Sequence, residues 1–256
     1  MKVSALSSGS SGNCFYIEKN DSAILVDIGI SAKRVEERLN LLNCQVEKIK
    51  GIFITHEHTD HIIGVDVFSR RYNIPIFATK GTITNGHLCS NRNLINPIKN
   101  NDIVDIGEFE IEAFKKSHKA ADPVSYSISD KNKVACVITD AGYACENIHD
   151  KISKSDFLFI ESNHDIKMLE NGGYPAFLKK WVKSDLGHLS NNQAALAVLE
   201  HGHRRLKHIV LSHISKTNNS PDVAMNTFGN LLRERSDLNT NLSVSLDNSP
   251  TRLFNV

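Results

Sequence analysis

The sequence predicts an α/β or α+β fold, built in layers around one hydrophobic core. Short apolar runs typical of buried strands alternate with stretches of helical periodicity along the chain. Hydrophobic residues make up 40% and charged residues 23% of the 256 residues, as in an ordinary globular protein with a large core. No repeat, low-complexity segment or clear linker interrupts the chain, so we expect a single domain spanning residues 1–256.

The first third of the chain predicts short strands around turns. Strands are expected at residues 2–6, 14–18 and 23–26. The small-residue loop Ser7–Asn13 is either a flexible hairpin turn or a loop whose backbone amides approach a ligand or phosphate. Ser31 can cap a helix in which Val35, Leu39 and Leu42 form one apolar stripe.

The rest of the chain continues the alternation. Further strands are expected at residues 51–55, 74–78, 109–114, 124–129, 134–139, 157–160, 208–211 and 242–246. We predict a helix over residues 60–72, a capping-box helix from Ser190 to Glu200 and a helix starting at Ser220–Pro221. The Asn-rich stretch 79–101 has no clear assignment, and residues 166–189 are typical of loop and helix.

Charge and cysteine content limit the functional classes. With 30 basic and 29 acidic residues, the chain has no global field that steers it to nucleic acid or an anionic membrane, although a local basic groove would suffice for nucleic acid. The five cysteines include no Cys-x-x-Cys, and Cys136 lies in an apolar run, which favours reduced, mostly buried thiols. No stretch resembles an export signal or a membrane span, so we expect a cytoplasmic protein without membrane association.

The most informative stretch is Gly51–His61. An apolar run ends there, and four potential metal ligands follow within six residues: His56, His58, Asp60 and His61. Imidazole together with carboxylate suits a divalent ion that polarises water. One metal would use only some of these groups, so the spacing suggests two adjacent sites completed by ligands from elsewhere in the chain.

Other predicted strands also end in residues that can bind metal. Asp27, His118, Asp140 and His213 each follow an apolar run directly or within a few residues. If these strands end at the same edge of a sheet, their side chains would lie in one common site. A single case would be commonplace, but four of them beside the ligand-rich stretch indicate a metal site.

These segments resemble the five ordered motifs of the metallo-β-lactamase superfamily. The matching segments are Val26–Gly29, Thr55–His61, Ser117–His118, Thr139–Gly142 and Leu211–His213. The resemblance covers nearly the whole chain, and it implies a four-layer αββα sandwich with a dinuclear metal site at one edge.

The resemblance also implies a ligand set. His56, His58 and His118 would bind one metal, Asp60, His61 and His213 the other, and Asp140 would bridge them. Asp27 would orient the ligand loop without touching metal, although it could also be a carboxylate that only caps a turn. The ligand types leave Zn²⁺, Mn²⁺ and Fe²⁺ open.

Within the superfamily, the sequence most resembles the WalJ/YycJ-like exonuclease family. Ser7–Cys14, Glu161–Asp165 and Gly187–Asn191 carry this likeness, and the last two are also similar to motifs of RNase J-type nucleases. The inserted domain of RNase J enzymes cannot fit into the short stretch between them. Lys119 departs from the pattern, because relatives often have Asp there.

The resemblance implies a DNA exonuclease of 5′-to-3′ type that uses a metal-bridging hydroxide. The candidate catalytic residues are Asp60, His188 and Glu161. We expect His188 to protonate the departing sugar oxygen and Glu161 to orient His188. Ser190, His164 and Asn13 are candidate substrate contacts, although Ser190 is also a helix cap and His164 could be a plain loop residue. A small-molecule hydrolase, such as a thioesterase or lactamase, and a non-catalytic sensor are the alternatives. The oligomeric state stays open.

Overall fold

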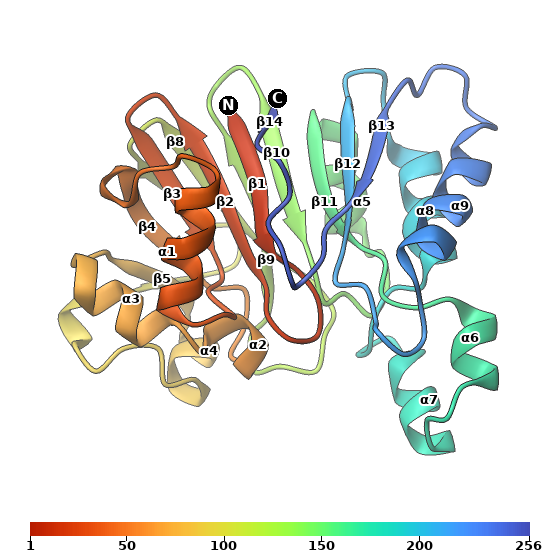
Figure 1. Ribbon diagram of the computed structural model, residues 1–256, viewed down its shortest axis with the longest axis horizontal. Helices are drawn as coiled ribbons and strands as arrows, with labels where there is room; N and C mark the ends of the chain where they lie inside the picture. The colour runs from red at the N-terminus through yellow and green to blue at the C-terminus, as the bar shows by residue number, and fades with distance from the viewer.

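Two seven-stranded sheets face each other in the computed structural model, which describes residues 1–256, and helices cover both outer faces (Figure 1). The strand order is β14-β1-β2-β3-β4-β5-β6 in the first sheet and β13-β12-β11-β10-β9-β8-β7 in the second. Three clusters of buried side chains fill the three interfaces between the layers. The four-layer αββα sandwich implied by the resemblance is therefore confirmed.

The first sheet is built from the first six strands of the chain plus the last strand. Its members are β1 (Lys2–Ser7), β2 (Cys14–Lys19), β3 (Ser22–Val26), β4 (Ile49–Phe53), β5 (Ile76–Thr79), β6 (Ile95–Ile98) and β14 (Phe254–Asn255). Pairing is antiparallel from β14 to β3 and parallel from β3 to β6.

The second sheet, like the first, has an antiparallel half and a parallel half. Its members are β7 (Ile103–Ile106), β8 (Phe109–Lys115), β9 (Val124–Ser129), β10 (Val134–Ile138), β11 (Phe157–Glu161), β12 (His208–Ser212) and β13 (Asn241–Val244). Pairing is antiparallel from β7 to β10 and parallel from β10 to β13. Parallel strands end at a common edge, which places the loops after them together.

Helices close the outer layers and one edge. The first sheet is covered by α1 (Ala32–Leu41), α3 (Val65–Tyr72) and α4 (Lys80–Asn85), and the second by α5 (Glu146–Lys154), α8 (Asn191–His201) and α9 (Pro221–Leu232). Three short helices, α2 (Thr59–Ile62), α6 (Ile166–Asn171) and α7 (Ala176–Val182), lie toward the edge opposite the two chain termini (Figure 1). No helix has the length and apolar character needed to cross a membrane.

The predicted helix over residues 60–72 is wrong as a single element. The chain forms α2 and α3 instead, with Ile63 and Gly64 between them. A Cβ on Gly64 would lie 2.1 Å from the carbonyl oxygen of Ile30, so the backbone turns here to pack closely against another loop. The break lets α2 present the candidate ligands Asp60 and His61 independently of the outer helix α3.

Other elements were not recognised from the sequence. The stretch 79–101 contains α4, a 3₁₀ turn at Arg92–Leu94 and β6. Helix α5 gave no capping signal, because its N-cap residue Cys145 makes no side-chain cap bond. In contrast, the capping box of Ser190 and Gln193 is present with both of its hydrogen bonds. All five cysteines are free, and four of them are buried.

Candidate metal centre and active site

Loops that follow six strands bring ionisable side chains to one edge of the sandwich. The contributing residues are Asp27 after β3, His56, His58, Asp60 and His61 after β4, His118 after β8, Asp140 after β10, Glu161 at the end of β11 and His213 after β12. This edge is the one that carries α2 and α7, away from both termini (Figure 1). Residues as far apart in the sequence as Asp27 and His213 therefore share one site.

Three of these strand-end residues have an unusual backbone conformation. Asp27, Asp140 and His213 have positive φ angles of 58°, 54° and 53°. The left-handed region is uncommon for residues other than glycine and costs free energy unless the surroundings hold it. The tight turns that result aim each side chain back over its strand end toward the shared centre.

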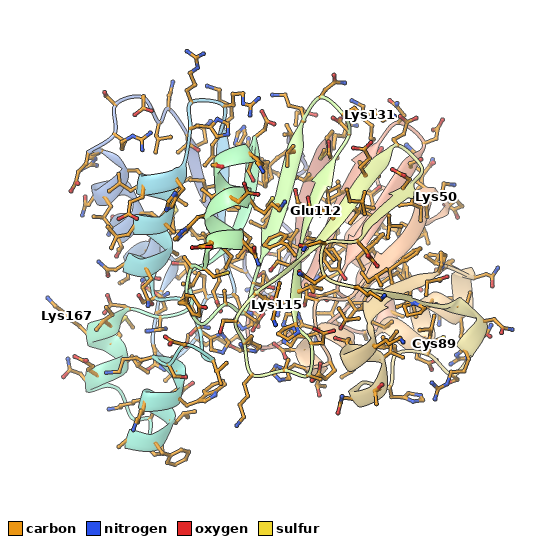
Figure 2. All side chains as sticks on the ribbon, turned by 180° about the vertical axis from the view of Figure 1, so that it is seen from behind. Lys50, Cys89, Glu112, Lys115, Lys131 and Lys167 are labelled. Carbon is orange, nitrogen blue, oxygen red and sulfur yellow. The ribbon has the colours of Figure 1, made fainter.

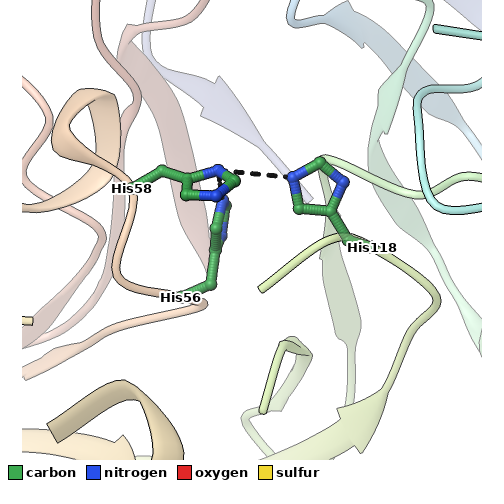
Figure 3. A group of neighbouring side chains, drawn as sticks. All are labelled: His56, His58 and His118. Atoms are coloured by element: carbon green, nitrogen blue, oxygen red, sulfur yellow. Dashed lines mark hydrogen bonds between the residues drawn. The ribbon is translucent and has the colours of Figure 1, made fainter. Parts of the chain in front are cut away.

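His56, His58 and His118 lie close enough together to hold one metal ion, and we call them the first ligand cluster (Figure 3). His58 Nδ1 lies 3.0 Å from His56 Nε2 and 3.4 Å from His118 Nε2, so three imidazole nitrogens converge on one point. The carbonyl oxygen of Gly187 accepts a hydrogen bond from His118 Nδ1 at 3.0 Å and fixes that ring. Burial lowers the pKa of His118 to about 4 and that of His56 well below its usual range. Both rings are thus neutral, the form that binds a metal ion.

Asp60, His61 and His213 form the second ligand cluster. His61 Nε2 lies 3.5 Å from Asp60 Oδ2 and 3.1 Å from Asp140 Oδ2, and His213 Nδ1 lies 3.2 Å from the same Asp140 oxygen. Burial lowers the pKa of His213, but the carboxylate of Asp140 outweighs burial and raises it to about 9. The pKa of His61 is likewise raised by Asp140 and Asp27 despite burial.

Asp140 lies between the two clusters, and one of its carboxylate oxygens lacks a hydrogen-bond partner. Its Oδ1 is 3.9 Å from His118 Nε2 in the first cluster, while its Oδ2 faces the second. Asp140 Oδ2 and His213 Nδ1 are both buried without a hydrogen-bond partner, although they are 3.2 Å apart. Buried polar atoms are rarely left unpaired. A cation bound between them would satisfy both, so the residues present fit a divalent metal centre.

Residues around the second cluster hold its members in place. Asp27 accepts hydrogen bonds from the Thr55 backbone amide at 2.8 Å and faces His61 Nδ1 at 2.7 Å. Asn13 is fully buried, and its amide nitrogen lies 3.4 Å from Asp60 Oδ2 and 3.2 Å from His61 Nε2. A fixed hydrogen-bond partner for a ligating histidine sets its ring orientation and tautomer.

His188 and Glu161 form a pair beside these clusters. His188 Nδ1 lies 2.7 Å from Glu161 Oε1 and 3.7 Å from Asp140 Oδ1. Glu161 Oε2 accepts hydrogen bonds from the backbone amides of Ala141 at 2.7 Å and Leu189 at 3.2 Å, so the carboxylate is rigidly placed. Burial acts to raise the pKa of Glu161, but His188 outweighs it and lowers that pKa, which keeps the carboxylate ionised. The Trp181 ring packs edge-on against His188, with centroids 5.4 Å apart.

The three candidate substrate contacts lie near this pair or the second cluster, but all are buried. The Ser190 hydroxyl makes both of its hydrogen bonds to Gln193 within the capping box, and Ser190 is 1% exposed. His164 pairs with Ser190 through a backbone bridge, and its buried Nδ1 has no partner. Asn13 supports Asp60 and His61 as described above. Their contact with substrate stays a prediction.

Sequence reasoning missed several residues that support the centre. Ser8 accepts a hydrogen bond from the backbone amide of His213 at 2.8 Å, and Asn163 donates to the carbonyl of His213 at 3.1 Å. Lys116 is buried close to Asp140 and was not singled out from the sequence. The Ser/Gly loop was the only available signal for Ser8, and nothing local marks the other two.

Comparisons with known proteins show the family to which the chain belongs. The family model described as the beta-lactamase superfamily domain matches residues 23–214. The chain is 35% identical over 240 residues to exodeoxyribonuclease YycJ of Bacillus anthracis, covering 92% of this chain and 90% of the relative. It is also 35% identical over 258 residues to exodeoxyribonuclease WalJ of Streptococcus pneumoniae, covering 97% and 94%.

A solved structure extends the agreement to three dimensions. The metallo-β-lactamase-fold protein YhfI from Bacillus subtilis superimposes with a TM-score of 0.73 at 15% identity, over 98% of each chain. At that identity the likeness supports the fold alone. Together with the family model and the two relatives of nearly equal length, it leads to one conclusion: this chain belongs to the metallo-β-lactamase superfamily, in the family of YycJ and WalJ.

Proposed function

We propose that this protein is a metal-dependent nuclease that hydrolyses phosphodiester bonds, with DNA as substrate and attack from a strand end. The observation that carries this proposal is the His188–Glu161 pair beside Asp140. Hydrolysis of a phosphodiester needs a proton donor for the departing sugar oxygen in addition to a metal centre. The two relatives named exodeoxyribonuclease support DNA and end-directed attack, and the family resemblance is the basis for 5′-to-3′ polarity.

The ligand clusters define what would hold the metal. One divalent cation would be held by His56, His58 and His118, a second by Asp60, His61 and His213, and Asp140 would contact both. Bound cations supply an activated water and neutralise the charge that develops on the phosphate. Imidazole ligands favour Zn²⁺, while the carboxylates also admit Mn²⁺ and Fe²⁺.

His188 and Glu161 have separate tasks in this proposal. Glu161 binds Nδ1 of His188 and leaves Nε2 to donate a proton to the departing oxygen. Because two backbone amides hold the other carboxylate oxygen, Glu161 is a positioning residue that fixes the ring of His188. Trp181 covers one side of the imidazole and limits its rotation.

The first test determines the class of substrate and the direction in which a strand is digested. Single- and double-stranded DNA and RNA, labelled at either end, are digested with Mn²⁺ or Zn²⁺, and a glutathione thioester and a β-lactam are assayed in parallel. We expect release of mononucleotides from the 5′ end of DNA. Turnover of the thioester or the lactam alone would replace the nuclease proposal with that of a small-molecule hydrolase. Retained metal without turnover of any substrate would favour the sensor.

The second test isolates the proton donor. His188→Ala should lower turnover of DNA by about 10²–10⁴-fold. It should lower turnover of bis-p-nitrophenyl phosphate far less, because the nitrophenolate leaving group needs no proton. His149→Ala, a histidine on α5 outside the site, is the matched control. Equal losses on both substrates would reject the acid role of His188.

A further inference from the structure

Lys116 is a buried lysine at the metal centre that the proposed mechanism does not use. It follows β8 directly, two residues before the ligand His118, and only 2% of its surface is exposed. Its Nζ donates a hydrogen bond to the carbonyl oxygen of Thr139 at 2.5 Å. Thr139 immediately precedes Asp140, so the ammonium group sits under the turn that carries the carboxylate shared by both clusters.

No carboxylate forms a direct ion pair with this ammonium group, because none lies within 4.0 Å of Nζ. A buried charge without a partner is strongly unfavourable. Burial accordingly lowers the pKa of Lys116, and the nearby carboxylates oppose that effect, in decreasing order Asp140, Asp27, Glu161 and Asp60. All four belong to the centre described above. The compensation for the buried lysine therefore comes from the same carboxylates that attract metal ions.

The charge of Lys116 in turn affects the two ligand clusters. Lys116 lies two residues before His118, and its Nζ binds the carbonyl of the residue that precedes Asp140, so its positive charge lies beside both ligand clusters. A buried positive charge in this position disfavours a divalent cation bound next to it. In a buried site this repulsion is weakly screened by solvent and salt.

We propose that Lys116 is a resident cation of the metal centre, which partly neutralises its carboxylates, weakens its hold on divalent ions and so keeps those ions exchangeable. The same charge stabilises the cluster of carboxylates when no metal is bound. The inference rests on the metal-binding part of the proposed function and assigns a positioning and tuning role to Lys116, not contact with substrate.

Three variants separate charge from packing. Lys116→Met removes the charge and the hydrogen bond, whereas Lys116→Gln removes the charge but keeps a donor for the Thr139 carbonyl. Lys115→Met, at the neighbouring exposed position labelled in Figure 2, is the matched control. The affinity for Zn²⁺ and for Mn²⁺ is measured by competition with a chromophoric chelator, and the rise in Tm on metal addition gives a second readout that needs no nuclease activity.

Both Lys116 variants should bind each metal about 10-fold or more tightly than the wild type, and metal should raise their Tm by more. Lys115→Met should match the wild type in both measurements. If Lys116→Met fails to fold, Lys116→Gln alone decides. Wild-type affinity in Lys116→Gln, or weaker binding, would overturn this inference and leave the nuclease proposal standing. A wild-type protein that binds no divalent metal would overturn the metal-dependent function itself.

Discussion

The two ligand clusters use the same side chain, histidine, in two different electrostatic environments. In the first cluster His56 and His118 are buried without a close carboxylate, apart from Asp140 Oδ1 at 3.9 Å from His118, and burial dominates their pKa values. In the second cluster, carboxylates dominate: Asp140 lies within about 3.2 Å of both His61 and His213, and the pKa values of both histidines rise. His56 and His118 are neutral before metal arrives, whereas His61 and His213 hold protons.

The groups that hold the histidine rings in place also differ in charge between the two clusters. In the first cluster, two of the rings are held by neutral groups, the Gly187 carbonyl for His118 and the Thr55 hydroxyl for His56. In the second cluster, His61 is held by a fully buried carboxylate, Asp27. The comparison teaches that ligand identity alone does not determine how a metal site behaves, because neighbouring charges decide whether a proton must leave first.

The largest effect is expected from removing the one residue that both clusters share. Asp140→Asn keeps the shape of the side chain but removes its charge, so it should weaken metal binding at both clusters and lower nuclease activity by more than about 100-fold. It should also return the pKa of His213 toward its ordinary value, because Asp140 is what raises it. Metal content and an NMR titration of His213 measure the two effects.

Asp105→Asn, on the exposed part of β7, is the control for a generic loss of one negative charge. If Asp140→Asn retained full metal content and activity, Asp140 would not join the two clusters.

A smaller and one-sided effect is expected from Asp27→Asn. Its amide would face His61 Nδ1 in place of an accepting carboxylate oxygen at 2.7 Å, so the ring would lose its orientation. We expect metal affinity at the second cluster to fall about 10–100-fold and that at the first to change much less. Zn²⁺ titrations resolved into two sites measure both, with thermal unfolding as a check on folding. A uniform loss at both sites would mean that Asp27 supports the fold and not one cluster.

The smallest effect is expected from Ser8→Ala. Ser8 accepts the His213 backbone amide at 2.8 Å and donates to Asn13 Oδ1 at 3.2 Å, so it links the N-terminal loop to the second cluster. Loss of one such hydrogen bond costs about 1 kcal/mol, or less than about 10-fold in metal affinity. Ser10→Ala, in the exposed part of the same loop, should have no effect. Equal behaviour of the two variants would remove Ser8 from the support of His213.

The local sequence pattern was enough to predict which candidate ligand follows each strand. It did not predict the contacts that hold these side chains in place. A polar residue that can bind metal is visible in the sequence directly after an apolar run, as at Asp140, or one residue later, as at His213. The family resemblance of the ordered set predicted the fold, which is confirmed, and a ligand grouping, which stays a prediction. Contacts such as Ser8 with His213 join residues 205 positions apart and leave no local trace.

The errors have equally physical causes. The helix predicted over residues 60–72 breaks at Gly64 because a carbonyl from a different loop approaches it, which helical periodicity cannot reveal. Lys116 comes two residues after the predicted strand over residues 109–114, where a lysine is expected at the surface, but tertiary packing buries it close to Asp140. Burial of a charged side chain is the least predictable of these features, because sequence pattern assigns such residues to the surface.

The most direct test of the difference between the clusters is a metal titration over a range of pH. A protonated imidazole excludes metal, so His213 must lose a proton first below its pKa of about 9, and so must His61, whose pKa is also raised. Affinity at the second cluster should therefore fall at least about tenfold for each unit of decreasing pH. The first cluster, with His118 near a pKa of about 4, should bind almost independently of pH between about 6 and 9. Zn²⁺ binding that resolves into one pH-independent and one pH-dependent site is the predicted result. Two sites with the same pH dependence, or no binding at either, would contradict it.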